Sequence, residues 1–561
     1  MKIRNTTRLL IAGMALIMLL AGSLQAANQK AAGLTSQIEA LIKPHFPADR
    51  PGLAVIVTQN GKVLFRKAFG SANLELGVPL RPDMLFRIGS MTKQFTAAAV
   101  MMLIEQGKVS LNDPITKFLP DYPVQGHMIT VEHLLTHTSG IQSYTDIPGW
   151  MTSKIMTDLK LSELIDGFKR EPMHFAPGTR FEYNNSGYML LGAIIEKASG
   201  ETYEAFLKKN IFDPLGMKNT LYGHNQPIIL NRASGYDADG DTVLNAPYLS
   251  MTQPHAAGAL LSTVDDLAKW DAALYTEKIL KQESLKRMWT PYTLKDGTST
   301  GYGYGWAIST LQGSPTIQHD GGIHGFVSDG LRLPQEKVYV AVLCNTTAPA
   351  LAPQLLTRKI AALALGKPFP ERKAIQVTPE VLARYAGVYK INDQSQRTVI
   401  VENGKLYTMR SGGQRLEAHP YSETEFFYTE TLSHFRFVLG PDGKVSEMWM
   451  YQNGSATPEI AARMADAPAP RQAVKLDPAI YDRYAGDYEL SPGFVLTIRR
   501  QGDKIMAQAT GQPEVEIFPE SENSFFLKEI DAQITFLLGS DGKAESLVLH
   551  QGGQDIPGKR K

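Results

Sequence analysis

An internal repeat in the C-terminal third of the chain limits the possible folds more than any other feature. The segment Ala383-Arg-Tyr-Ala-Gly-Val-Tyr389 returns as Asp482-Arg-Tyr-Ala-Gly-Asp-Tyr488, at an offset of 99 residues. The same offset relates Phe437-x-Leu-Gly-x-Asp-Gly-Lys444 to Phe536-x-Leu-Gly-x-Asp-Gly-Lys543. Because one register without gaps relates the two segments, they indicate a duplicated domain.

Each copy of the repeat has the pattern of a small all-β domain. In the first copy, β-branched runs such as Thr398–Glu402 alternate with the hairpin signals Asn403-Gly404 and Asp442-Gly443. This spacing predicts two meandering, lipocalin-like barrels of about eight strands each, over residues 377–465 and 476–557. We expect side chains, rather than a ligand, to fill barrels of this size.

The region ahead of the repeats, residues 27–366, mixes strands and helices. Leu53–Phe65 is typical of a hairpin around Asn60-Gly61, the middle of the region has helical periodicity, and strands return at Thr316–Gln318 and Lys337–Leu343. We therefore expect an α+β domain in which both ends of the region build one antiparallel sheet, covered by a helical insert.

Residues 1–26 have the pattern of a cleavable signal peptide. Basic residues at Lys2, Arg4 and Arg8 precede the apolar run Leu9–Ala21, which is short for a membrane span. We expect cleavage, a periplasmic or secreted mature protein and no stable membrane insertion. An uncleaved inner-membrane anchor is the alternative.

Charge and composition limit the kinds of molecule that this protein is expected to bind. The 57 Lys and Arg residues balance 56 Asp and Glu residues, which leaves no long-range field to gather phosphates, so nucleic acid is not an expected partner. Cys344 is the only cysteine, which excludes an internal disulfide. His133 and His137 have the i, i+4 spacing of metal ligands but lack the Glu of His-Glu-x-x-His, so neither a metal nor another cofactor is expected.

The segment Ser90-Met-Thr-Lys93 contains a candidate nucleophile, Ser90. Apolar residues follow at helical spacing and Gly107 is placed to end the helix. Ser90 is therefore expected at a helix N-terminus, where free amides and the dipole favour negative charge. Lys93 lies on the same helix face and would activate the serine if burial lowers its pKa. The alternative is that Ser90 is a plain N-cap.

Two further segments contain candidate catalytic or substrate-binding residues. Tyr183-Asn-Asn185 lies on a turn ahead of an apolar helix, and His319-Asp-Gly-Gly322 ends a predicted strand with glycines that permit close approach of a ligand. A phenol becomes a usable base beside cations, which Lys93 and His319 are placed to supply.

With these three motifs in this order, residues 29–365 resemble the penicillin-recognising serine hydrolases: class C β-lactamases, low-molecular-weight penicillin-binding proteins, family VIII esterases and D-aminopeptidases. The family's signatures are Ser-x-x-Lys, Tyr-x-Asn and Lys-or-His-x-Gly, which correspond to the motifs at Ser90, Tyr183 and His319. The resemblance implies a β-lactamase/transpeptidase-like fold. D-aminopeptidases also carry two small β-barrels after the catalytic domain.

The resemblance also implies roles for these residues. Ser90 would attack a carbonyl, with Lys93 and Tyr183 moving its proton. Backbone amides of Ser90 and Gly322 would form the oxyanion hole. Asn185 would hold Lys93 or a substrate amide. His319 would stabilise charge beside Tyr183, and the backbone at Gly321 would help to bind the substrate.

One departure from the family pattern bears on the substrate. Asp320 follows His319 where many carboxypeptidases and lactamases have Thr or Ser, so a carboxylate aimed into the site would repel penicillins and D-Ala-D-Ala termini. Alternatively, Asp320 faces away. The favoured function is an exported serine hydrolase acting on short peptides or amides, including D-residues. A carboxylesterase or β-lactamase is the runner-up, and a non-catalytic sensor or scaffold is the non-enzymatic alternative. Self-association into a homo-oligomer is a further expectation.

Overall fold

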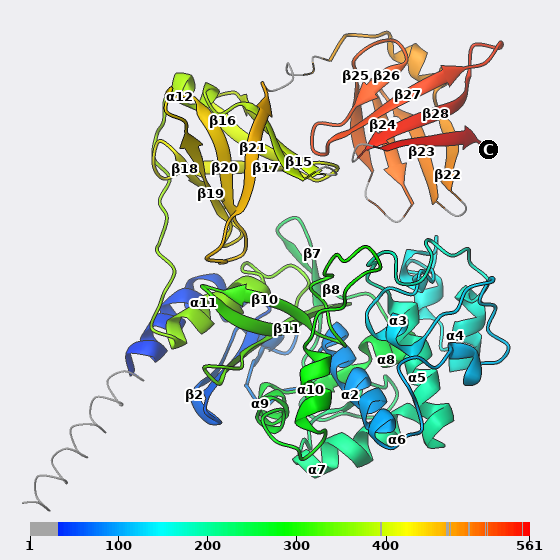
Figure 1. The fold of residues 1–561 in the computed structure, drawn as a ribbon, viewed down its shortest axis with the longest axis vertical. Coiled ribbons are helices and arrows are strands. Elements are labelled where there is room, and N and C mark those ends of the chain that lie inside the picture. The colour runs from blue at the N-terminus through cyan, green and yellow to red at the C-terminus, as the bar shows by residue number, and fades with distance from the viewer. Residues whose placement is uncertain are drawn as a thin grey trace, which may run out of the picture.

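The computed structural model describes residues 32–392, 395–466, 471, 473–491, 494–510, 512, 514–551 and 554–561. It contains an α+β domain and two β-barrels (Figure 1). The signal peptide expected over residues 1–26 lies outside the described residues. Within the described residues, no helix is long and apolar enough to span a membrane.

A six-stranded antiparallel sheet forms the centre of the first domain. Its order is β10-β11-β12-β13-β1-β2, so strands from both ends of the domain meet where β13 pairs with β1, as expected from the sequence. Its strands are β1 Leu53–Gln59, β2 Lys62–Phe69, β10 Ala307–Leu311, β11 Ser314–Ile323, β12 Phe326–Leu333 and β13 Val338–Cys344. Asn60 and Gly61, both with positive φ, make the β1–β2 turn.

Alternation along β1 places a core on each face of this sheet. Ala54 and Ile56 face the large helical insert, whereas Val55 and Val57 pack towards Leu356 of α11 and the helical segment 32–42. The longer helices are α2 Thr92–Glu105, α5 Asn185–Ser199, α9 Val264–Ala273 and α11 Pro353–Ala364. The domain is therefore a sheet covered by helices on both faces.

Shorter helices and strands complete the first domain. The short helices are α3 Val131–Leu135, α4 Leu161–Phe168, α6 Tyr203–Leu207, α7 Asp213–Leu215, α8 His255–Gly258 and α10 Gln282–Met288. The short strands are β3 Ser71–Asn73, β4 Val78–Pro79, β5 Phe86–Arg87, β6 Leu221–Tyr222, β7 Tyr236–Asp239, β8 Thr242–Asn245 and β9 Leu260–Ser262.

The repeats form two closed eight-stranded barrels, as predicted. The first follows α12 Pro379–Ala383 and contains β14 Gly387–Asn392, β15 Ser395–Glu402, β16 Lys405–Arg410, β17 Arg415–Pro420, β18 Glu425–Phe427, β19 His434–Leu439, β20 Val445–Tyr451 and β21 Glu459–Ala465. The second contains β22 Gly486–Ser491, β23 Phe494–Gln501, β24 Lys504–Ala509, β25 Val515–Pro519, β26 Ser524–Phe526, β27 Ala532–Leu538, β28 Ala544–Gln551 and β29 Gln554–Arg560.

Equivalent aromatic pairs lie in the core of each barrel. Tyr385 stacks on Phe437 with ring centroids 4.2 Å apart, and Tyr484 stacks on Phe536 at 4.6 Å. Buried side chains of this kind form a core cluster in each barrel. The sequence repeat therefore corresponds to equivalent core packing in the two barrels.

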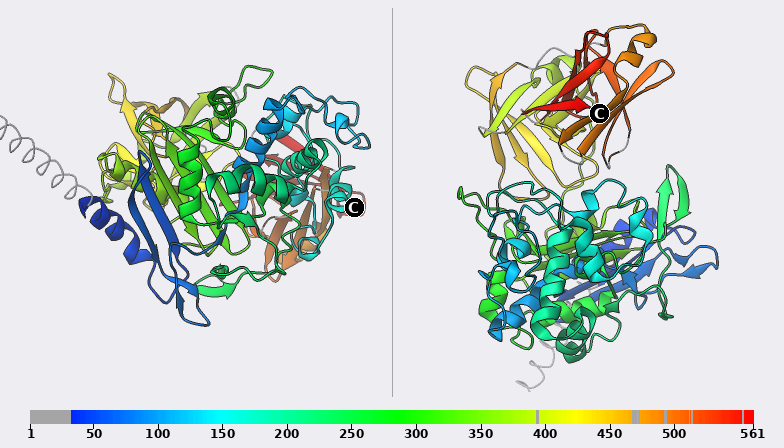
Figure 2. Two further views of the ribbon diagram at one scale, coloured as in Figure 1. Left: turned by 90° about the horizontal axis from the view of Figure 1, so that it is seen from below. Right: turned by 90° about the vertical axis from the view of Figure 1, so that its right-hand side faces the viewer.

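The first barrel contacts the first domain through the backbone carbonyls of Asn453 and Gly454. The amide of Gln312 donates to the carbonyl of Gly454, and Nη1 of Arg358 on α11 donates to the carbonyl of Asn453 at 3.0 Å. The barrels contact each other where the amide of Arg415 donates to the carbonyl of Glu529. Both barrels lie on the same side of the first domain (Figure 2).

Candidate active site

Ser90 lies at the entry to α2, as the sequence predicts. β5 leads into a 3-10 turn over Gly89–Met91, and α2 begins at Thr92. Gly89 has φ +50°, and a Cβ there would lie 3.0 Å from both the amide nitrogen and the carbonyl oxygen of Gly322. Glycine at position 89 therefore lets the backbone around Ser90 approach the edge of β11.

Lys93 is fully buried and its amine lies within hydrogen-bonding distance of three oxygens. Nζ is 3.0 Å from Ser90 Oγ, 2.9 Å from Asn185 Oδ1 and 2.9 Å from the carbonyl oxygen of Ala257. The oxygens of Asn185 and Ala257 only accept, so a neutral amine donates its two hydrogens to them and turns its lone pair to the Ser90 hydroxyl. Burial lowers the pKa of Lys93 to about 7, which makes this neutral form accessible near neutrality.

Asn185 is held at the first turn of α5. The preceding residue, Asn184, caps the helix by accepting from the amide of Gly187 at 2.7 Å. The amide of Asn185 donates to Ser143 Oγ at 3.2 Å, and its side-chain nitrogen donates to Thr145 Oγ1 at 3.3 Å. These bonds turn the Asn185 oxygen towards Lys93.

Tyr183 contacts both Lys93 and Ser90. Lys93 Nζ lies 4.7 Å from the centre of the Tyr183 ring, and a hydrogen bond links the phenol with Ser90. Although 38% of Tyr183 is exposed, desolvation of its hydroxyl end raises the pKa of the phenol above its usual value, and the bond with Ser90 offsets only part of this rise. The phenol is therefore neutral near pH 7, rather than the base that neighbouring cations would make of it.

His319 is neutral too, which corrects the expectation that it adds positive charge beside Tyr183. The pKa of His319 is lowered to about 4, mainly by burial, with the charge of Lys93 acting in the same direction and the carboxylate of Asp320 in the opposite one. Nδ1 donates to the carbonyl of Asp320 at 2.6 Å, so Nε2 accepts from the hydroxyl of Tyr302 at 2.8 Å. The ring centroids of His319 and Tyr183 are 6.2 Å apart.

The turn that carries Tyr183 is fixed from inside by His137. The backbone amide of Asn184 donates to His137 Nδ1 at 2.9 Å, and the imidazole packs 4.3 Å from the ring of Tyr183 and 4.8 Å from that of Tyr302. His133 instead accepts from the amide of Thr130 and caps α3. The two histidines thus have separate structural bonds, and no group of three or more His, Cys, Asp or Glu side chains placed to hold a metal occurs in the described part of the chain.

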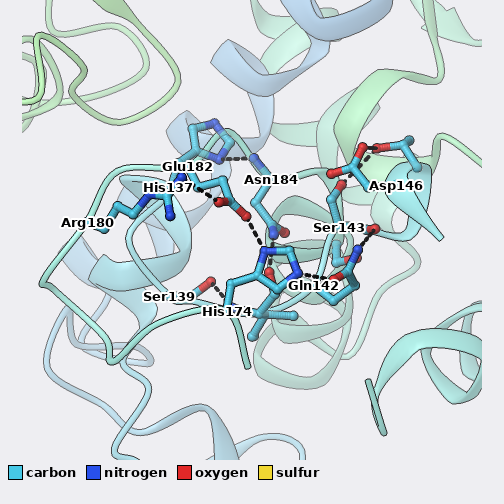
Figure 3. Close-up of polar contacts among 12 residues, drawn as sticks. His137, Ser139, Gln142, Ser143, Asp146, His174, Arg180, Glu182 and Asn184 are labelled. Atoms are coloured by element: carbon cyan, nitrogen blue, oxygen red, sulfur yellow. Dashed lines mark hydrogen bonds and ion pairs between the residues drawn. The ribbon is translucent and has the colours of Figure 1, made fainter. Parts of the chain in front are cut away.

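A polar network braces the outer side of the same turn (Figure 3). His174 Nδ1 lies 2.5 Å from Glu182 Oε1, and its Nε2 contacts Gln142. The bond with Glu182 raises the pKa of His174, and the reverse effect lowers the pKa of Glu182. Glu182 is the residue before Tyr183, so this ion pair holds the turn against the loop at Gln142.

The three residues after His319 face different surroundings on β11. Asp320 is 59% exposed and accepts from Gln354 Nε2 on α11 at 3.1 Å, so its carboxylate is bonded to the helix on the opposite face of the sheet from His319. A Cβ at Gly321 would lie 2.1 Å from the carbonyl oxygen of Ile88, whereas one at Gly322 would meet nothing within 4 Å. β10 pairs with β11 only as far as Gln318, so the edge of β11 at Gly322 is free to face the site.

A pocket of about 100 Å³ lies beside Ser90 and Gly322. Its other walls are Tyr144, Thr145, Met151, Ile155, Asn185, Leu249, Pro254, Ala257, Gly258, Ile323 and His324. Three contributions to the site have no counterpart in the sequence motifs: the carbonyl of Ala257, the hydroxyl of Tyr302 and the stacking of His137. Ala257 acts through its carbonyl oxygen, which leaves no signal in a side-chain pattern.

Comparison with known proteins shows which families this chain resembles. A profile described as Beta-lactamase matches residues 38–365, and one described as a domain of unknown function (DUF3471) matches residues 371–464 and again 470–560. Penicillin-binding protein 4* of Bacillus subtilis is 31% identical over 431 residues, which cover 72% of this chain and 93% of that relative. A D-aminopeptidase of Gluconobacter oxydans is 28% identical over 334 residues, 58% of this chain and 62% of the relative.

Solved structures with the same fold point the same way. The octameric penicillin-binding protein homologue from Pyrococcus abyssi has a TM-score of 0.54 and 28% identity, covering 77% of this chain and 99% of that one. D-amino acid amidase from Ochrobactrum anthropi, complexed with L-phenylalanine amide, has a TM-score of 0.51 and 25% identity, covering 60% of this chain and 99% of that one.

Proposed function

Because this chain belongs to the beta-lactamase family of serine hydrolases, we propose that it hydrolyses short peptides or amides, including ones with D-residues, through an acyl-enzyme on Ser90. The observation that carries the proposal is the amine of Lys93, which has two acceptors besides Ser90 Oγ and a pKa of about 7. An unassisted serine is a weak nucleophile, and an adjacent base with a pKa near the working pH is what activates it.

The reaction begins with proton transfer from Ser90 to Lys93. Oγ attacks the substrate carbonyl, and the backbone amides of Ser90 and Gly322 receive the developing oxyanion. Tyr183, with its neutral phenol, passes the proton from Lys93 to the leaving amine. Water then attacks the acyl-enzyme and loses a proton to the same two residues. The proton returns to Ser90 Oγ as the acyl group leaves.

The relatives and the pocket support an amide substrate. A D-aminopeptidase and a D-amino acid amidase are among the similar proteins. The pocket offers Met151, Ile155 and Leu249 to a compact apolar side chain on the acyl part of the substrate. The carboxylate of Asp320, bonded to Gln354, acts on that substrate only from the far side of the strand.

Export and self-association belong to the same proposal. The leader pattern over residues 1–26 supports export to the periplasm or medium. The octameric homologue from Pyrococcus abyssi supports assembly into a homo-oligomer. The duplicated barrels supply surface for such contacts.

Labelling with a fluorophosphonate tests the proposed function. We expect an adduct on the wild-type protein that disappears in Ser90→Ala. Absence of any adduct would favour a non-catalytic sensor. A panel of D- and L-aminoacyl anilides, short-chain esters and a chromogenic cephalosporin then separates amidase from esterase and β-lactamase activity, and faster turnover of an ester or the cephalosporin than of every anilide would contradict the proposed substrate class.

A further inference from the structure

Arg87 lies three residues before Ser90 and lacks a strong partner. On β5, its Nη1 donates to the carbonyl of His324 at 3.4 Å and its Nη2 to Asn225 Oδ1 at 3.3 Å, both long bonds. Its Nε is buried without a hydrogen-bond partner. Most buried polar side-chain atoms in folded proteins have at least one hydrogen-bond partner.

A second arginine, Arg232, contacts the same side-chain oxygen of Asn225. Arg232 Nη2 lies 3.5 Å from Asn225 Oδ1, and its Nη1 donates to the carbonyl of His224 at 3.1 Å. Burial and, to a smaller extent, the charge of Arg232 lower the pKa of Arg87 to about 10. Two guanidinium groups therefore share one amide oxygen and repel each other.

The nearby carboxylates are bonded elsewhere. Asp237 accepts from Thr347, and Asp158 accepts from Ser250 at 2.5 Å. Among the described residues, neither Arg87 nor Arg232 has a carboxylate oxygen within 4.0 Å. The pair is thus a local excess of positive charge without a protein counterion, which is a costly arrangement for partly buried groups.

His324 connects this charge to the pocket beside Ser90. His324, whose carbonyl receives Arg87, lines the pocket with Ser90 and Gly322. It follows Gly322 by two residues, whereas Asp320 precedes Gly322 by two. The two arginines therefore add positive charge beside the His324 end of β11, whereas the Asp320 carboxylate is bonded to α11 on the opposite face of the sheet.

Resting on the proposed function, we infer that Arg87 and Arg232 form a subsite for a carboxylate of the substrate, at the His324 end of the pocket. Planar guanidinium groups bind carboxylates through paired hydrogen bonds, and a carboxylate between the two arginines satisfies their weakly bonded donors and screens their repulsion. Good substrates are therefore acidic amides or peptides, with the anionic group on the side of the scissile carbonyl that lies towards His324.

Two fluorophosphonates test this inference without knowledge of the natural substrate. One has an alkyl chain that ends in a carboxylate and the other is its methyl ester, each made with a short and a long spacer. We expect the carboxylate probe to label wild-type Ser90 about tenfold faster than the ester at one spacer length, the scale of one charge-assisted hydrogen bond. Arg87→Gln and Arg232→Gln should each bring that ratio close to one.

Arg66→Gln is the control, because Arg66 is a partly exposed arginine on β2 that pairs with Asp265. It removes the same charge and should leave the wild-type ratio unchanged. The inference is overturned if the wild-type ratio is near one with both spacers, or if the arginine variants slow both probes by the same factor. If neither probe labels wild-type protein, the proposed function fails and this inference falls with it.

Discussion

The hydroxyl of Tyr302 donates to Nε2 of His319 over 2.8 Å, while Nδ1 of the same ring donates to the carbonyl of Asp320. Both ring nitrogens therefore have partners that suit the neutral imidazole. In consequence Lys93, whose pKa is about 7, is the group of this cluster that changes charge near neutrality.

The Tyr302→Phe variant should raise the pKa of His319 from about 4, because loss of the hydroxyl donor frees Nε2 to take a proton. Stability should fall by about 1 kcal/mol, the net value of one hydrogen bond. A histidine titration followed by NMR measures the first effect and urea unfolding the second. An unchanged His319 titration would show that Tyr302 does not hold the neutral ring.

The rate should rise with pH through about 7. Below this value Nζ of Lys93 carries a third proton and has no lone pair for the Ser90 hydroxyl, whereas above it the amine is free. The pH profile of kcat/KM measures this, and Lys93→Arg should abolish the rise and lower kcat/KM at least a hundredfold. His319→Gln is the comparison: a rise near pH 7 that persists in this variant belongs to Lys93, and one that disappears would return the titration to His319.

Tyr183→Phe should lower kcat by about a hundredfold, the usual scale for lost acid–base help. The control is Tyr385→Phe. Tyr385 is a buried tyrosine of the first barrel whose hydroxyl donates to the carbonyl of Glu423 at 2.8 Å, so this change removes a similar phenol outside the active site. It should cost about 1 kcal/mol of stability. Near-normal turnover by Tyr183→Phe would exclude its phenol from proton transfer.

The sequence predicted the parts of this site that act through side chains in a recognisable order. Ser90, Lys93, Tyr183 and Asn185 lie on helix ends, where capping and periodicity leave a local signal. The repeat predicted the barrels for a similar reason, because its offset is visible without any structure.

What the sequence left open depends on direction and on backbone atoms. Whether Asp320 faces the substrate is decided by its bond to Gln354 on α11, a contact across 34 positions of the chain. The neutral state of His319 follows from burial and from Tyr302, neither of which its motif specifies. The carbonyl of Ala257 has no sequence signal at all.

Two adjacent glycines give a matched test of how β11 approaches Ser90. In Gly321→Ala the new Cβ would lie 2.1 Å from the carbonyl oxygen of Ile88 and 2.5 Å from Ser328 Oγ, so the backbone leading to Ser90 must move. We expect a loss of about 1–3 kcal/mol in the free energy of unfolding, the usual cost of overpacking, together with slower fluorophosphonate labelling. In Gly322→Ala the Cβ meets nothing within 4 Å, and stability should stay within about 0.5 kcal/mol of wild type. Urea unfolding of both variants measures the difference. Equal stability of the two would mean that β11 and the Ile88 backbone do not approach each other as closely as this geometry requires.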